Sequence, residues 1–177
     1  MIRIRFILVA IALALTSGGA SLAQNASQSV LELSWADLLP PGETRYIAQL
    51  QAQQATIDHF GAASMPQIQT YNVVEELDGR RVRMGGYVLP FDLVGGRQVS
   101  RFLLVPYVGA CIHVPPPPPN QLVYVETSEP IEITGLWDAV WVEGIMYTER
   151  FDNSLGNTAY TLELTDIRPY ELSLIHI

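Results

Sequence analysis

Residues 82–88 read VRMGGYV and residues 140–146 read VWVEGIM. In both stretches every second residue is apolar or glycine, and the glycines Gly86 and Gly144 occupy the same place in the pattern. Alternate residues of a β-strand share one face, so each glycine is expected on the apolar face of its strand. Glycine inside a strand permits a sharp bend, as at a barrel corner. The shared pattern therefore predicts two bent strands.

Further strands are predicted on either side of these two segments. Residues 99–105, 122–126 and 158–168 are short and rich in β-forming side chains, and Gly95-Gly96 is typical of a hairpin turn. With residues 81–89 and 139–149 they give about five strands in a three-plus-two order. The sequence thus predicts a mainly β fold, a small OB-like barrel, with a β-sandwich as the alternative.

An N-terminal helical segment is predicted before the strands. Pro40-Pro41-Gly42 is a turn that can start a helix. From Glu43 to Phe60 apolar side chains recur at roughly helical spacing, namely Tyr46, Ile47, Leu50, Ile57 and Phe60.

The first 23 residues have the pattern of a secretory signal. Arg3 and Arg5 precede an apolar run of about ten residues, which is shorter than the about twenty needed to span a bilayer. The run is followed by small residues ending at Ala23. We therefore expect a periplasmic or secreted protein without a transmembrane segment in its mature chain; an N-terminal membrane anchor is the alternative.

The rest of the chain divides into three expected parts. Residues 24–42 form an N-terminal extension, and residues 43–171 form a single β-rich domain. Residues 172–177 read LSLIHI, which is the in-frame translation of a common sequencing adapter. We interpret this tail as read-through and set His176 aside as a ligand candidate.

Charge limits the range of partners. The ten basic residues are all arginine, and without Arg3 and Arg5 there are 8 basic against 18 acidic residues, a net charge of −10. A chain this acidic is expected to repel nucleic acid. The barrel therefore does not predict oligonucleotide binding.

The segment from 102 to 121 reads FLLVPYVGACIHVPPPPPNQ and holds the candidate site. Cys111 is the sole cysteine, so an internal disulfide is excluded, and His113 lies two residues further on. In an extended backbone both side chains point the same way, and thiolate and imidazole are good zinc ligands. A zinc site would need further ligands, for which His59, Asp92, Asp138, Glu149 and Asp152 are available.

Alternatives to a metal site remain open for this segment. Cys111 lies among apolar residues and can be a buried structural side chain, a nucleophile or a partner in an external disulfide. The prolines from Pro115 to Pro119 predict a polyproline rod that cannot join a sheet. The sequence shows no phosphate loop, serine-histidine elbow or dinucleotide fingerprint, so a non-enzymatic role is favoured.

The same segment resembles the bacterial exported family of domain of unknown function 3299. The resemblance runs from about residue 33 to 170 and includes residues 35–40, WADLLP, residues 86–90, GYVLP, and the Gly109 to Gln121 motif. It implies an accessory protein of envelope transport or metal homeostasis, associated with ABC-type transporters and zinc. The site residues that the resemblance implies for this chain are Cys111, His113, Asn120 and Gln121. This chain lacks the lipid-attachment cysteine of the lipoprotein-type members.

Three functions are therefore compared. The first is a periplasmic binding or accessory protein linked to Zn²⁺ through Cys111 and His113, with a transport or envelope protein as partner. The second is a non-metal protein-interaction module, which predicts an exposed apolar patch beside the loop. The third is a cysteine-dependent enzyme with Cys111 as nucleophile and His113 as base.

Overall fold

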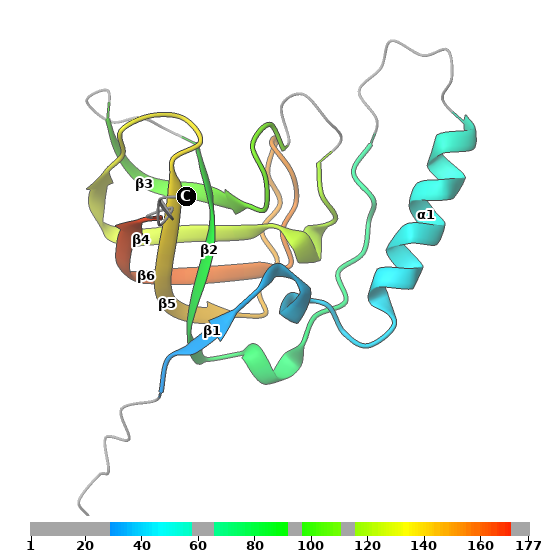
Figure 1. Cartoon of the computed structure of the whole chain (residues 1–177), viewed down its shortest axis with the longest axis horizontal. Coiled ribbons are helices and arrows are strands. Elements are labelled where there is room, and N and C mark those ends of the chain that lie inside the picture. The colour runs from blue at the N-terminus through cyan, green and yellow to red at the C-terminus, as the bar shows by residue number, and fades with distance from the viewer. Residues whose placement is uncertain (1–28, 58–65, 92–96, 111–115, 171–177) are drawn as a thin grey trace, which may run out of the picture.

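The computed structural model describes residues 29–57, 66–91, 97–110 and 116–170. Five strands form a closed barrel in the order β2-β3-β4-β6-β5, which closes where β2 pairs with β5 (Figure 1). All pairs in the barrel are antiparallel except β4 with β6. This is the order of an OB-type barrel, and the predicted fold class is confirmed. The strands are β2 (Arg80–Pro90), β3 (Gln98–Val105), β4 (Val123–Glu132), β5 (Ala139–Tyr147) and β6 (Tyr160–Pro169).

The two glycines of the repeated pattern lie where neighbouring strands approach most closely. A Cβ on Gly86 would lie 2.7 Å from Cγ of Leu104 on β3. A Cβ on Gly144 would lie 2.2 Å from the carbonyl oxygen of Glu163, beside an irregularity in the β5–β6 register. Near Gly86, β2 changes its partner from β5 to β3. The predicted bends are thus the corners that let the sheet close.

Apolar side chains from alternate strand positions fill the barrel. Val82, Met84 and Val88 of β2 are fully buried there with Phe102 and Leu104 of β3. This alternation is the predicted one, because a strand directs every second side chain to the same face.

The segment before the helix belongs to the same core. Strand β1 (Leu31–Leu33) pairs parallel with β2, and the short 3-10 helix η1 (Trp35–Leu38) follows it. Leu33 and Leu38 are buried in the barrel core. Sequence analysis assigned no strand to this extension, because three residues are too few to show an alternation.

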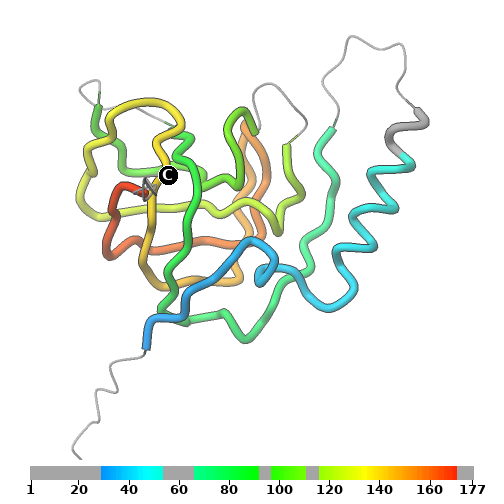
Figure 2. Tube along the Cα trace, viewed as in Figure 1, coloured from blue at the N-terminus to red at the C-terminus, as the bar shows by residue number. Residues whose placement is uncertain are grey.

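Helix α1 (Glu43–Ile57) begins where it was predicted, and residues 58–60 of the prediction lie outside the described part. Figures 1 and 2 show α1 beside the barrel, with the extended chain that starts at Pro66 running between them. Of its side chains from Glu43 to Gln53, only Glu43 and Ile47 are buried. The helix is therefore held near its first two turns, and its exposed faces remain open to solvent.

One further difference from the sequence prediction concerns strand β4. Strand β4 extends to Glu132, past the predicted end at 126, because Ile131 and Glu132 pair with Val99 and Gln98 beyond a bulge. The predicted Gly95-Gly96 turn lies outside the described residues. The short 3-10 helices η2 (Glu75–Leu77) and η3 (Pro119–Gln121) precede β2 and β4. Within the described residues, no helix has the length and apolar character needed to cross a bilayer.

Candidate binding groove

The outer face of β3 and β4 is the usual ligand face of an OB-type barrel, and here the chain itself covers it. Leu103, Val105 and Tyr124 point outward from these strands and are buried under Ala110 and the β5–β6 connection. Phe151 of that connection stacks on Tyr124 with ring centroids 3.9 Å apart. These side chains are therefore not open to a ligand.

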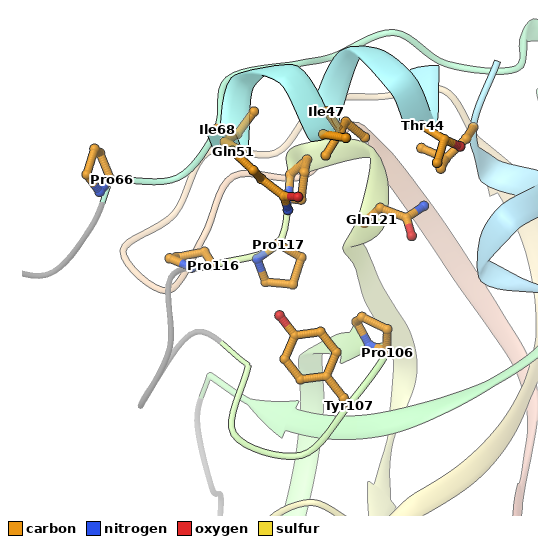
Figure 3. A pocket seen from close by; sticks show the side chains of 13 residues that line it. Thr44, Ile47, Gln51, Pro66, Ile68, Pro106, Tyr107, Pro116, Pro117 and Gln121 are labelled. Carbon is orange, nitrogen blue, oxygen red and sulfur yellow. The ribbon is translucent and has the colours of Figure 1, made fainter. Parts of the chain in front are cut away.

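A groove of about 600 Å³ lies beside the covering segment. Thr44, Ile47 and Gln51, on one face of α1, form its first wall, and Pro106 and Tyr107 form the opposite wall (Figure 3). Figure 3 shows Gln51 pointing from the helix toward the proline segment and the Tyr107 hydroxyl pointing toward the same prolines. The remaining lining residues are Leu39, Ala48, Pro66, Ile68, Pro116, Pro117, Pro118 and Gln121.

The chemistry of this groove differs from that of the chain as a whole. The thirteen described residues that line it include no charged side chain, although the chain carries a net charge of −8. Proline and aliphatic groups predominate, and Thr44, Gln51, Tyr107 and Gln121 add hydroxyl or amide groups. Such a surface suits a neutral ligand that has both apolar groups and hydrogen-bonding groups.

Hydrogen bonds fix the proline segment that forms part of the groove. Nε2 of Gln67 donates to the carbonyl oxygens of Pro117 and Asn157, at 2.7 and 2.9 Å. Oε1 of Gln67 accepts from the Asn157 amide at 2.9 Å. The amide of Ala159, just before β6, donates to the Pro119 carbonyl oxygen at 2.8 Å. Because prolines have no amide hydrogen of their own, they are held through their carbonyl groups.

A buried polar cluster connects α1 to the end of the proline segment. Glu43, the first residue of α1, is only 5% exposed and accepts hydrogen bonds from Thr70, Asn72 and Asn120. Asn120 is fully buried and also donates to the carbonyl oxygen of Asn72 at 2.9 Å. Among described side-chain atoms, its Oδ1 is one of two buried atoms without a hydrogen-bond partner. The cluster therefore holds the start of α1 against the end of the proline segment.

The predicted motif residues have different positions in this arrangement. Gly109 has a left-handed backbone with φ of 85°, which favours glycine at that place. Asn120 is a structural residue of the buried cluster, and Gln121 lines the groove while donating to the Trp35 carbonyl oxygen at 2.8 Å. Cys111, His113 and Pro115 lie outside the described residues.

The zinc site stays a prediction. Residues 29–57, 66–91, 97–110 and 116–170 contain no group of three His, Cys, Asp or Glu side chains that could hold a metal ion. Two proposed additional ligands have other partners, since Asp138 accepts hydrogen bonds from Thr134 and Asp152 pairs with Arg150 at 2.7 Å. The candidates His59 and Asp92 lie outside the described residues, and Glu149 is exposed.

Most residues of the groove carry no local signal in the sequence. Gln51 is one of several similar glutamines in the predicted helical segment, so nothing in the sequence distinguishes it. Pro106 and Tyr107 lie in the segment from 102 to 121. A proline next to a tyrosine, shortly before the proline run, is the sequence feature that could have indicated a ligand-binding surface there. The two walls come together through contacts between residues far apart in the sequence, and a local sequence pattern cannot predict such contacts.

The fold and groove together define a class of protein. A closed five-stranded barrel, preceded by a helix and covered on its usual ligand face, is a single-barrel protein of the OB type. Residues 35–169 match the family model described as protein of unknown function, DUF3299, and the chain belongs to this family.

A solved member of the family has a similar structure. The crystal structure of a DUF3299 family protein from Pseudomonas aeruginosa PAO1 is 34% identical in sequence and has a TM-score of 0.62. The similarity covers 82% of this chain and 99% of that chain. No curated protein matches this chain in sequence.

Proposed function

We propose that the chain is a non-catalytic binding module that holds an uncharged, proline-rich segment of a partner protein in the groove. The observation that carries this proposal is the lining, which has no charged side chain among its thirteen described residues. An ionic ligand would find no countercharge among these thirteen residues, whereas a neutral segment would not be repelled by the acidic chain.

Hydrogen-bonding groups favour a peptide over a lipid chain. Thr44 and Gln51 are exposed on the α1 wall, and both side chains can donate to peptide carbonyl groups. An acyl chain would leave these groups without partners in a covered groove, at a cost of about 1–3 kcal/mol for each buried group.

Aromatic and proline rings favour a proline-rich segment in particular. Tyr107 is 44% exposed and faces the proline segment across the groove (Figure 3). Proline-rich segments are already extended in solution, so they lose little entropy when they dock on grooves lined by aromatic rings. The adjacent Val108 is 58% exposed and adds an apolar side chain beside Tyr107.

The predicted signal peptide makes the partner an exported or envelope protein in this proposal. Family resemblance extends it to an accessory role beside a transport system, with Zn²⁺ bound through Cys111 and His113. Neither extension is needed for the groove to bind peptide.

The proposal is tested by fluorescence anisotropy on the chain without its predicted signal peptide. The probe is a blocked, labelled proline decamer, and the comparison is a glycine-serine decamer. We expect binding of the proline peptide alone. Gln51→Ala and Tyr107→Ala should each weaken it by about tenfold, the effect of losing one central contact.

Two control variants make the same kinds of substitution at residues that do not line the groove. Gln49→Ala removes an exposed glutamine from the same helix, and Tyr46→Ala removes a tyrosine that is 45% exposed. Both should bind like the unmodified chain. Equal binding of the two decamers, or no binding of either, would contradict the proposal.

A further inference from the structure

A second cavity, of about 660 Å³, lies on the side of the barrel formed by β1, β2 and β5. Four aromatic side chains line it, namely Trp35, Tyr87, Trp141 and Tyr170. The charged side chains among its described lining residues are Glu32 and Asp37, both acidic. The cavity thus differs in charge from the groove, whose described lining residues include no charged side chain.

The backbone of β2 allows the aromatic rings to gather there. A Cβ on Gly85 would lie 3.4 Å from the Tyr170 ring and 3.5 Å from the Trp141 ring, so these rings lie against a strand without a side chain. Trp141 and Tyr170 stack with centroids 5.1 Å apart. The Trp35 indole donates to the Gly85 carbonyl oxygen at 2.9 Å, which fixes a third ring.

Both charge and ring chemistry in this cavity favour a cation. Asp37 accepts hydrogen bonds from the amide and hydroxyl of Ser34, at 2.7 and 2.6 Å. These bonds lower the pKa of Asp37, so its carboxylate is ionised at neutral pH. Beside the cavity, Arg83 of the chain itself places its guanidinium carbon 4.7 Å from the centroid of the Trp141 ring, a cation–π contact of the kind that such rings favour.

The cavity adjoins the groove. Pro106 lines both of them. Gln121 of the groove also donates to the carbonyl oxygen of Trp35, which lines the cavity. One extended segment can therefore reach both places.

We infer that the aromatic cavity receives a basic side chain, that of an arginine next to the proline-rich segment of the same partner. This inference rests on the proposed function, since the groove must first hold the prolines. The groove would then select for an extended apolar segment, and the cavity would select for the charge beside it.

The test compares three blocked, labelled peptides by fluorescence anisotropy at low and high salt. One is the proline decamer, the second carries arginine at both ends, and the third carries citrulline, the neutral counterpart of arginine, at both ends. We expect the arginine peptide to bind about five- to tenfold more tightly than the citrulline peptide. Salt should reduce this difference.

Variants test whether the preference for the arginine peptide arises in the aromatic cavity. Glu32→Gln and Tyr170→Ala should reduce the preference for arginine. Glu129→Gln, which removes an exposed charge elsewhere, and Tyr46→Ala should retain this preference. A proline decamer that binds without any gain from arginine would overturn this inference and leave the proposed function standing. Failure of all three peptides would instead overturn the proposed function.

An arginine preference that persists in both Glu32→Gln and Tyr170→Ala would also overturn the inference. In that case the general negative charge of the chain, rather than the cavity, would attract the arginine.

Discussion

Gln67 is hydrogen-bonded through its side-chain amide to the carbonyl oxygen of Pro117, at 2.7 Å. The two residues are 50 positions apart, and the same amide group also exchanges two hydrogen bonds with Asn157. One neutral side chain therefore joins the chain before β2, the proline segment and the β5–β6 connection. The shape of the groove depends on this junction.

Gln67→Ala should lower the free energy of unfolding by about 1–3 kcal/mol, because the carbonyl groups of Pro117 and Asn157 lose their donor in a partly buried position. Urea unfolding measures the loss. Gln49→Ala, on the exposed side of α1, should change stability by no more than about 0.5 kcal/mol. A Gln67→Ala variant as stable as Gln49→Ala would show that the junction does not hold the segment.

Gly144→Ala should destabilise the barrel by about 1–3 kcal/mol or more, since its Cβ would lie 2.2 Å from the backbone oxygen of Glu163. Gly135→Ala is the matched control, because the nearest described atom would be 3.9 Å away, on Asp138. Thermal unfolding of the two variants distinguishes them. Equal midpoints would mean that β5 and β6 can separate at this corner without cost.

The barrel could be predicted from the sequence because its main signal is local. Gly86 and Gly144 interrupt an alternating pattern, and the alternation and the bend both follow from strand geometry. The end of β4 could not be predicted in this way. Its last part contains Glu129 and Pro130, which resemble a turn, and the strand continues beyond them because Ile131 and Glu132 pair with Val99 and Gln98 of β3.

The groove could be predicted only in part. The proline run identified one side, but Gln51 and Tyr107 are 56 residues apart in the sequence numbering and meet through the fold. Asn120 was singled out as a motif residue, and its structural environment is a buried contact with Glu43. The Gly109 to Gln121 motif thus contains Asn120, which stabilises the fold, as well as Gln121, which lines the groove.

Alkaline pH should destabilise the protein through Tyr160. Its hydroxyl donates to the Leu38 carbonyl oxygen and accepts from the Val74 amide, both at 2.8 Å. Burial raises the pKa of Tyr160 to about 12. The unfolded value is about 10, so this contribution to stability is complete below about pH 10 and is lost as pH rises through 12.

Tyr160→Phe should therefore show a weaker fall of the unfolding free energy between about pH 10 and 12. At neutral pH it should be less stable by about 1–2 kcal/mol, because the Val74 amide loses its partner. Urea unfolding across this pH range, with Tyr46→Phe as the exposed control, measures both effects. Parallel pH profiles for Tyr160→Phe and the unmodified chain would contradict the role assigned to Tyr160.

Zinc binding through Cys111 and His113 is a separate prediction from the sequence. After addition of Zn²⁺ and desalting, an untagged chain should retain about one metal ion, and less at low pH because both ligands must lose protons. Cys111→Ser and His113→Ala should each abolish retention, and Glu129→Gln should not. A chain that retains no zinc would remove the metal from the account, while the groove would be unaffected.

The central claim is that the groove between α1 and Pro106-Tyr107 binds an uncharged proline-rich peptide. Its most direct test is an NMR titration of the nitrogen-15-labelled chain with the blocked proline decamer. The account predicts that amide shifts concentrate at Gln51, Ile68, Tyr107 and Gln121, while Glu129 and Thr165 stay unchanged. Shifts confined to other surfaces, or no shifts when the peptide is in large excess, would contradict the claim.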